Sequence, residues 1–326
     1  MNKFRTLSKV RQYFRQEDSY EAQREDQTFL TGQMAAKQIR HLEKLEHLWD
    51  AEFRVSSQWG EDGIIEWLVH HLGDMPEVFV EFGVQNYCES NTRFLLQHRN
   101  WRGLVIDGSE MHVDYIRQDR ISWRHDLTAV ASFITRDNIN SIISGAGFQG
   151  ELGILSVDID GVDYWVWEAI QCVNPQILIV EYNSALGDLL PLTVPYAADF
   201  VRTRAHHSNL YYGMSIRAAV FQANRRGFTL VGTNSAGNNA FFVRNDRAEA
   251  VLKRLGRVQD RPSRFRESRE ANGALTFASP ADRASIIAHL PVIDVATQAR
   301  MALGEAGALY SPRWQALLNG QSATST

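Results

Sequence analysis

The densest group of chemically reactive side chains follows two apolar segments of the sequence. The stretch SVDIDGVDYW supplies Asp158, Asp160 and Asp163, and the stretch VEYNS supplies Glu181 and Asn183. Carboxylates that crowd one crevice repel one another, and burying them unpaired is costly. Three arrangements relieve this repulsion. They are a hard cation such as Mg²⁺ held by Asp158, Glu181 and Asn183, ion pairs with Arg or Lys, or one carboxyl group that keeps its proton.

A glycine and further carboxyl groups lie at the ends of other apolar runs. EVFVEFG contains Glu81 and ends at Gly83, where the missing Cβ either lets a ligand approach the backbone or only closes a tight turn. Asp107, in LVIDGSE, either accepts hydrogen bonds from both hydroxyls of a ribose or caps the helix that starts near Glu110. Asp126, in SWRHDLT, is expected to follow a weaker third strand and either to receive an adenine amino group or to cap the next helix.

Three residues are candidates for a general base. Asp160 is the first choice. The next candidates are the adjacent His206 and His207 of TRAHHSNLYYG, because an imidazole near the site accepts a proton at neutral pH. The alternative for the two histidines is an exposed loop without a role. Trp165 and Trp167 lie on an apolar helical face, which favours a place in the core over a stacking platform.

An alternation of strand-like and helix-like segments positions these residues. Such alternation from about residue 56 to 245 implies βαβ units and a doubly wound, mostly parallel α/β sheet, whose ligands bind beyond the carboxyl ends of the strands. FTLVGT and AFFVRN flank the Gly/Asn-rich NSAGNN and predict an antiparallel pair. The expected strands are 77–83, 102–107, 153–161, 176–183, 228–233 and 240–245, with helices over 90–99, 111–118, 128–144 and 162–171.

Residues 1–55 form a separate N-terminal extension with helical patterning. Its first fifteen residues are basic and amphipathic, so this segment either lies on an anionic membrane surface or is a solvated or frayed helix. Further on, Ile39, Leu42, Leu45 and Trp49 mark one face of an expected helix. That face either docks on the main domain or pairs with a second copy of the chain.

Residues 246–326 form a C-terminal extension that returns to helix and loop. PADRASIIAHL and ARMALGEAGALY predict helices, and the charged, Pro-containing VQDRPSRFRESRE predicts an exposed connection between them and the central domain. The sequence therefore divides into helical extensions around a central domain at 56–245.

Composition excludes several classes of protein. The 326 residues carry a formal net charge of −4, which argues against a general nucleic-acid binder, and the 2 cysteines are too few for a disulfide framework. No apolar run approaches the ~20 residues that span a bilayer, and the start lacks the apolar core of a signal peptide, so we expect a cytoplasmic protein. The GxGxxG, GxSxG, P-loop and CxxC motifs are also missing.

An ordered set of motifs resembles one family. SQWGEDGIIEWL, FVEFGVQNYCESNTRFL, RNWRGLVIDGSE, LSVDIDGVDYWVWEAI and ILIVEYN are similar to the FkbM-type methyltransferases, which use S-adenosylmethionine and have a Rossmann-like core. The likeness covers roughly residues 56–245. It implies a seven-stranded methyltransferase sheet with a β-hairpin at one edge, which the two closing strands fit.

The resemblance also implies roles for individual residues. Glu81 and Gly83 would line the methionine end of the cofactor, Asp107 would hold the ribose and Asp126 the adenine, and Asp158 would lie next to the reactive methyl group. The Asp158-x-Asp160 pair resembles the metal-and-base pair of metal-dependent sugar O-methyltransferases, whose further ligands would correspond to Glu181 and Asn183. The chain departs from these patterns: it lacks GxGxG, and it has Glu-Tyr-Asn in place of adjacent Asp-Asp or Asp-Asn.

Together these features predict an S-adenosylmethionine-dependent O-methyltransferase. Its substrate would be a hydroxyl of a sugar or glycan, such as a cell-surface polysaccharide or a natural-product sugar, and Mg²⁺ or another divalent cation would be a further cofactor. Two other functions stay open. One is a non-catalytic scaffold that keeps the fold, and the other is a metal-dependent hydrolase that uses the acidic cluster.

Overall fold

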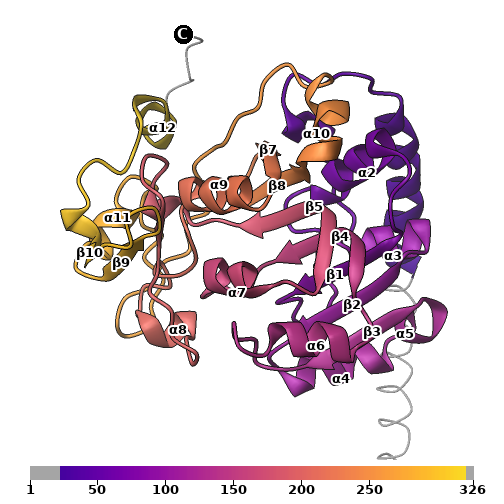
Figure 1. Cartoon of the computed structure of the whole chain (residues 1–326), viewed down its shortest axis with the longest axis horizontal. Helices are drawn as coiled ribbons and strands as arrows, with labels where there is room; N and C mark the ends of the chain where they lie inside the picture. The colour runs from indigo at the N-terminus through magenta and orange to yellow at the C-terminus, as the bar shows by residue number, and fades with distance from the viewer. Residues whose placement is uncertain (1–22, 321–326) are drawn as a thin grey trace, which may run out of the picture.

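A seven-stranded sheet lies at the centre of the computed structural model, which describes residues 23–320 (Figure 1). The strand order is β3-β2-β1-β4-β5-β8-β7, with β1 to β5 parallel and β8 antiparallel to both β5 and β7. This arrangement confirms the predicted doubly wound, mostly parallel sheet with an antiparallel hairpin at one edge. The strands are β1 (Val78–Phe82), β2 (Arg102–Asp107), β3 (Leu127–Ala131), β4 (Gly150–Val157), β5 (Val173–Glu181), β7 (Phe228–Thr233) and β8 (Asn239–Arg244).

The central strands are apolar because helices cover both faces of the sheet. Along β5, Leu178 and Val180 enter one hydrophobic cluster while Ile177 and Ile179 enter the other. Successive side chains of a strand point to opposite faces, so a run that is buried on both sides must be apolar throughout. Helices α6 (Ile139–Gly145), α7 (Asp163–Ala169) and α9 (Ile216–Arg225) cover the first face, and α2 (Glu61–Leu72), α3 (Arg93–Arg99), α4 (Glu110–Gln118), α5 (Ile121–Arg124) and α10 (Asn245–Leu252) cover the second.

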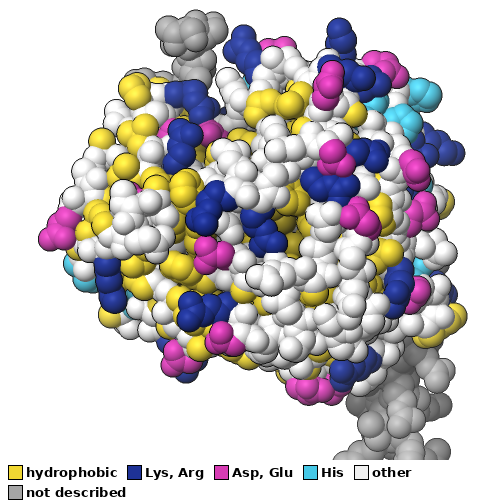
Figure 2. Space-filling view, in the orientation of Figure 1, with side chains coloured by type: hydrophobic (Ala, Val, Ile, Leu, Met, Phe, Trp, Pro, Cys, Tyr) yellow, Lys and Arg dark blue, Asp and Glu magenta, His cyan; other side chains and the backbone are white. Residues whose placement is uncertain are grey.

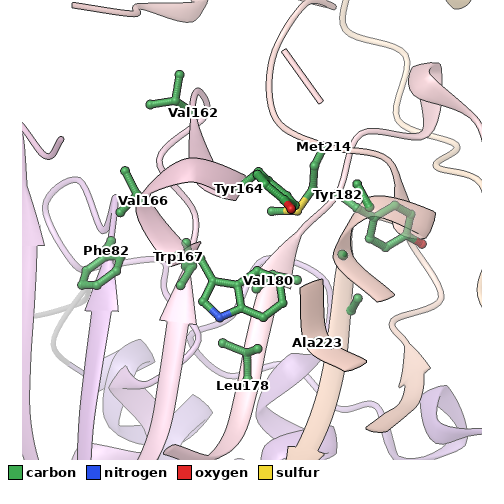
Figure 3. Close-up of a cluster of buried hydrophobic side chains, with 14 of the residues drawn as sticks. Phe82, Val162, Tyr164, Val166, Trp167, Leu178, Val180, Tyr182, Met214 and Ala223 are labelled. Atoms are coloured by element: carbon green, nitrogen blue, oxygen red, sulfur yellow. The ribbon is translucent and has the colours of Figure 1, made fainter. Parts of the chain in front are cut away.

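The tryptophans of α7 belong to the core, as the sequence predicts. The Trp167 ring lies over Leu178 and Val180 of β5 (Figure 3), and its side chain is fully buried. Trp165 packs against the same cluster and donates its indole N–H to the Val194 carbonyl at 2.8 Å. Neither ring is available as a platform for ligand stacking.

The expected helix over 128–144 is wrong in its first half. Leu127–Ala131 is strand β3, which pairs in parallel with Gly103–Asp107 of β2, and only Ile139–Gly145 is helical. As an edge strand, β3 is half-buried at every position, and it lacks the continuous apolar run that marks the inner strands. Asp126 therefore precedes the third strand, contrary to the expectation that it follows it.

The C-terminal extension is mixed and not simply helical. ARMALGEAGALY contributes strand β10 (Arg300–Ala302) and the single turn η3 (Leu303–Glu305), where the sequence predicted a helix. β10 pairs with β9 (Pro291–Asp294), which pairs with β6 (Leu192–Thr193) from the central domain, so the extension is tied into the domain by a small antiparallel sheet. The remaining short elements are η1 (Leu48–Ala51), η2 (Ser184–Leu186), α8 (Arg202–Ala205), α11 (Arg283–Ile286) and α12 (Pro312–Leu318).

The N-terminal segment packs on the central domain. A helix over 23–40 ends before the expected stripe does, so the stripe is not one helical face. Ile39 and Leu45 are nevertheless buried in the second hydrophobic cluster, whereas Leu42 is exposed, which confirms the docking alternative for this segment. Glu66 of α2 pairs with Arg40 (2.6 Å) and Arg99 (2.8 Å) and so fixes the end of this helix. The basic, amphipathic first fifteen residues lie outside the described part of the chain.

Among residues 23–320, no helix has the length and apolar character needed to cross a membrane. On the face shown in Figure 2, Lys and Arg side chains lie interspersed with Asp and Glu.

Candidate functional site

Two adjoining cavities open beyond the carboxyl ends of β1, β2, β4 and β5, where a doubly wound sheet binds ligands. The large cavity has a volume of ≈ 310 Å³ and the small cavity ≈ 200 Å³. Gly83, Gln85, Asp158 and Asp160 line both, so the two spaces meet at these residues. The small cavity extends past Asp107, and the large cavity extends past Glu81 and Glu181.

Gly83 is required where the loops after β1 and β4 touch. Its φ is +69°, and a Cβ there would lie 1.8 Å from the backbone oxygen of Asp158. Only a residue without a side chain allows this approach. The close contact is with the protein's own backbone, and it fixes the floor that the two cavities share.

Asp107 holds two loops at the wall of the small cavity. Its Oδ2 accepts the Gln85 N–H at 2.7 Å, and its Oδ1 accepts the Ser109 N–H at 2.8 Å and lies 3.2 Å from His112 Nδ1. The cap of α4 is Ser109, whose hydroxyl accepts the His112 N–H, so the capping alternative for Asp107 is wrong. Each carboxylate oxygen keeps lone pairs that can face a ligand.

Glu81 organises the loop in front of α3. Its Oε1 accepts the Asn91 N–H at 2.8 Å, and its Oε2 accepts the Thr92 N–H at 3.1 Å and the Thr92 hydroxyl. Burial raises the pKa of Glu81 to about 7, although these hydrogen bonds oppose the shift. Glu81 lines the large cavity, but both of its oxygens already have protein partners. The structure shows Glu81 holding this loop, and its place at the methionine end of a cofactor stays a prediction.

Three carboxyl groups converge at the junction. Oxygens of Asp158, Asp160 and Glu181 all lie within 4.8 Å of one another. Burial, followed by the charges of Asp160 and Asp163, raises the pKa of Asp158 well above its ordinary range, and burial, followed by the charge of Asp158, raises the pKa of Glu181. Within residues 23–320, the Oε2 of Glu181 is buried without a hydrogen-bond partner. Such a group holds a proton or awaits a cation.

Arg202 supplies the positive charge beside this cluster, and sequence reasoning missed it. Its guanidinium pairs with Asp160, donates to the Asn209 carbonyl at 2.7 Å and stacks 4.0 Å from the Tyr212 ring centre. On its far side lies Glu267, 4.0 Å away. Asp160 is thus relieved by an ion pair, while Asp158 and Glu181 are not.

Asp163 and Asn183 have structural roles. Asp163 is buried and accepts the N–H groups of Ile159 (2.7 Å) and Gly161 (2.8 Å), which closes the loop after β4. The Asn183 amide donates to the carbonyls of Leu210 (2.8 Å) and Tyr212 (3.0 Å), and its oxygen accepts the Ala185 N–H at 2.9 Å. Asn183 lines the large cavity, and its oxygen keeps a second lone pair, so its role as a metal ligand stays a prediction.

The structure places the other predicted residues away from the cavities. Asp126 lies at the amino end of β3, with its side chain 69% exposed and 3.7 Å from Arg102. It does not line the small cavity; Ser132 and Phe133, at the carboxyl end of β3, occupy the place predicted for it. His206 and His207 line neither cavity.

The two histidines form a surface group with His289. The His206 ring centre is 4.1 Å from that of His207 and 5.5 Å from that of His289. Burial and these neighbours lower the pKa of His206. As they stand, the histidines do not reach the carboxyl cluster, which leaves Asp160 as the candidate base that lies at the junction.

The predicted exposed connection at 258–270 also forms a wall of the large cavity. Ser263, Phe265 and Glu267 line it, together with Arg283 of α11. The charges in this segment suggested solvent, but Glu267 faces Arg202 and Asn209. Sequence patterns carry no signal for such a return of the chain over the sheet.

Comparisons with known proteins concern the fold alone. No family model and no curated protein matches the sequence. The chain is similar to the N-terminal domain of EvdMO1 with SAH bound, with 7% identity, 55% of this chain and 77% of that chain covered, and a TM-score of 0.36. It is also similar to an S-adenosylmethionine-dependent methyltransferase from Clostridium acetobutylicum, with 10% identity, 56% and 90% covered, and a TM-score of 0.36.

A third solved structure has the same character. It is an S-adenosylmethionine-dependent methyltransferase from Geobacter sulfurreducens in complex with S-adenosyl-L-homocysteine, with 13% identity, 56% of this chain and 70% of that chain covered, and a TM-score of 0.31. The sheet itself, five parallel strands continued by an antiparallel pair, is the arrangement that the resemblance implied.

Proposed function

We propose that this protein is an S-adenosylmethionine-dependent methyltransferase of the FkbM type that methylates a hydroxyl of a sugar or glycan. The observation that carries the proposal is the junction at Gly83. A small cavity that passes a strand-end aspartate meets a larger polar cavity there, beside the carboxyl cluster. An elongated cofactor and a second substrate can meet at such a junction.

The small cavity is suited to the nucleoside end of the cofactor. Asp107 would face the ribose hydroxyls, and Ser132 and Phe133 would stand beside the base in place of Asp126. Gly83 and Asp158 would line the path into the large cavity, and the loop held by Glu81 would meet the methionine end. When bound, the cofactor supplies an electrophilic methyl group.

The carboxyl groups at the junction would manage the proton of the attacking hydroxyl. A hydroxyl becomes a competent nucleophile when a positioned base takes its proton. Asp160 lies on both cavities, and its ion pair with Arg202 fixes its orientation. We propose Asp160 as the base, with the Asp158–Glu181 pair as the next candidate because burial raises the pKa of both groups.

The lining of the large cavity supports a polyhydroxylated substrate. Its polar side chains include Gln58, Asn86, Asn238, Glu267 and Arg283. Amide, carboxylate and guanidinium groups together both donate and accept hydrogen bonds, which is what neighbouring sugar hydroxyls need.

A divalent cation also fits the residues that are present. Asp158, Asp160 and Glu181 would hold it, since three oxygen donors converge and one buried oxygen lacks a partner. A bound cation would orient the sugar hydroxyls and lower the pKa of the attacking one. Arg202 already pairs with one of the three carboxylates and would compete with the ion there.

Calorimetric titration with S-adenosylhomocysteine, with and without Mg²⁺, tests the proposal. We expect saturable binding in both conditions. If S-adenosylhomocysteine does not bind while Mg²⁺ does, a metal-dependent hydrolase becomes the better reading. Binding without methyl transfer to any sugar would favour a non-catalytic scaffold.

A further inference from the structure

Two exposed aromatic rings stand together at the large cavity. Trp59 is 36% exposed and Phe265 is 46% exposed, and both line the cavity. Their ring centres are 5.9 Å apart and the rings meet edge to face at 68°. Neither ring is among the buried or partly buried residues of the two hydrophobic clusters that hold the fold together. Their presence is therefore not explained by core packing.

Trp59 is held in place by a buried charge. The Glu61 carboxylate accepts the Trp59 backbone N–H at 2.9 Å, and its other oxygen accepts the side-chain amides of Asn234 (2.7 Å) and Asn239 (2.9 Å). Glu61 is fully buried, and Gly60 has a φ of 110°, which turns the chain so that the tryptophan lies outside the helix that follows. The segment SQWGED thus fixes Trp59 to the β7–β8 hairpin.

The next residue of this segment serves the same loop. Asp62 Oδ2 accepts the backbone N–H groups of Val55 (2.7 Å), Ser56 (2.9 Å) and Ser57 (2.8 Å). The loop that carries Trp59 is therefore anchored twice. Asp62 binds the residues that precede Trp59, and Glu61 binds the backbone of Trp59 itself. The backbone at Trp59 is thus fixed in advance of any ligand.

Phe265 is anchored on the same hairpin from the opposite direction. Arg283 donates to the Ser263 carbonyl at 2.8 Å, and the Ser263 hydroxyl accepts the Phe265 N–H at 3.2 Å. The preceding Pro262 packs so closely on the hairpin turn that a Cβ at Gly237 would lie 2.6 Å from its backbone. Segments about 200 residues apart in the sequence thus present two rings over one hairpin.

Rigidly held aromatic rings that lie outside the core and line a concave polar site are suited to contact a ligand. The cavity also carries polar side chains, among them Asn238, Arg202 and Glu267. A pyranose ring has one face rich in C–H groups and an edge of hydroxyls. The aromatic pair can pack against the C–H face of such a ring. The amide, guanidinium and carboxylate groups can form hydrogen bonds with its hydroxyls.

We propose that Trp59 and Phe265 form the wall that binds the methyl acceptor, and that they stack against the C–H face of a sugar ring. This inference rests on the proposed methyltransferase function and adds the part of the site that selects the substrate class. The SQWGED segment then has a functional reason as well as a structural one, since it orients Trp59.

A glycan array tests this wall with the full-length protein and its variants. We expect the wild type to bind one or more glycans, and Trp59→Ala and Phe265→Ala each to weaken that binding about tenfold or more, which corresponds to ~1.4 kcal/mol. Trp59→Phe should retain most of the binding. Trp123→Ala is the matched control, because Trp123 of α5 is 73% exposed and lines neither cavity, so glycan binding should not change.

Titration of each variant with S-adenosylhomocysteine separates this inference from the function on which it rests. Unchanged cofactor affinity in Trp59→Ala and Phe265→Ala shows that the variants are folded and that the loss concerns the methyl acceptor. Equal glycan binding by both variants and the wild type overturns the inference that Trp59 and Phe265 bind the methyl acceptor. If the wild type binds S-adenosylhomocysteine but no glycan, the inference that a sugar binds against Trp59 and Phe265 is overturned. Failure to bind S-adenosylhomocysteine overturns the methyltransferase function, whatever the array shows.

Discussion

Gly83 and Asp158 are in direct backbone contact. A Cβ added to Gly83 would lie 1.8 Å from the carbonyl oxygen of Asp158, and the two residues line both cavities. The contact joins the loop after β1 to the loop after β4, the two neighbouring central strands of the sheet. The relative position of the proposed cofactor path and the carboxyl cluster therefore depends on one glycine.

Gly83→Ala should weaken S-adenosylhomocysteine binding at least about tenfold and lower the melting temperature. The new Cβ must push the Asp158 backbone away, and the positive φ alone costs ~1–2 kcal/mol for a residue with a side chain. Calorimetry and thermal unfolding measure the two effects. Gly73→Ala is the control, since Gly73 has nearly the same φ (+70°) but nothing within 4 Å of the added Cβ. Equal effects of both substitutions on binding would contradict the importance of the contact.

Asp107→Ala should weaken S-adenosylhomocysteine binding by about tenfold or more. Hydrogen bonds to a charged group contribute ~1.5–3 kcal/mol, and the carboxylate also holds the Gln85 and Ser109 backbone N–H groups. Asp126→Ala is the matched control at the opposite end of the sheet and should leave affinity unchanged. Unaltered affinity in folded Asp107→Ala would remove the ribose role, and a loss in Asp126→Ala would restore the role expected from the sequence.

Glu81 should make stability depend on pH. Burial raises the pKa of Glu81 from 4.5 to about 7, so the folded protein binds this proton more tightly than the unfolded chain does. The resulting stabilisation is complete below pH ~4.5 and is lost as pH rises through about 7; its full size is on the order of 3 kcal/mol. Urea unfolding at pH 5 and pH 8 should show a smaller pH effect in Glu81→Gln than in the wild type. Glu110→Gln, on the exposed face of α4, should keep the wild-type difference.

Leu48→Ala should lower the free energy of unfolding by about 2–5 kcal/mol, the usual cost of truncating a buried leucine. Leu48 is 1% exposed and lies against Gly232 of β7, where a Cβ would be 2.8 Å from its own. Leu42→Ala makes the same chemical change at a site that is 39% exposed and should cost far less. Denaturant unfolding compares the two. Similar small losses would mean that the N-terminal segment contributes little to the stability of the central domain.

The inner strands could be predicted from the sequence because burial on both faces leaves an apolar run with sharp ends. Among them, β2 at Arg102–Asp107 has the predicted bounds. The edge strand β7 at Phe228–Thr233 also has the predicted bounds, and there the Gly/Asn-rich NSAGNN marks its end. β3 could not be recognised, because an edge strand that is half-buried has no such run. The error moved Asp126 to the wrong end of the sheet, which shows how one misplaced strand misplaces a site residue.

The carboxyl cluster could be predicted because its members follow adjacent parallel strands, β4 and β5. Arg202 could not, since 42 residues separate it from Asp160 and it lies on a single helical turn. The wall at 258–270 was hidden for a related reason: its Glu267 faces Arg202 within the site, whereas a charge run in a sequence usually indicates solvent. Long-range partners of this kind become visible only in the folded chain.

The carboxyl cluster of Asp158, Asp160 and Glu181 has two candidate roles, Mg²⁺ binding and proton removal, which experiments can distinguish. If the three carboxylates hold Mg²⁺, calorimetric titration with Mg²⁺ alone should show binding that is lost in Asp158→Asn and Glu181→Gln. Glu267→Gln is the control for cation binding, because Glu267 lies beyond Arg202 and outside the cluster. Chelation should then abolish methyl transfer and added Mg²⁺ should restore it.

If Asp160 is the base, Asp160→Asn should reduce turnover by about 10²–10⁴ while S-adenosylhomocysteine affinity stays near the wild-type value. The pH–rate profile of this variant should also lose the limb that belongs to the carboxylate. A chelator without effect, combined with an inactive Asp160→Asn, would exclude the metal and keep the base. Methyl transfer that survives both treatments would exclude a required cation and Asp160 as the base, and it would leave the Asp158–Glu181 pair as the candidate base.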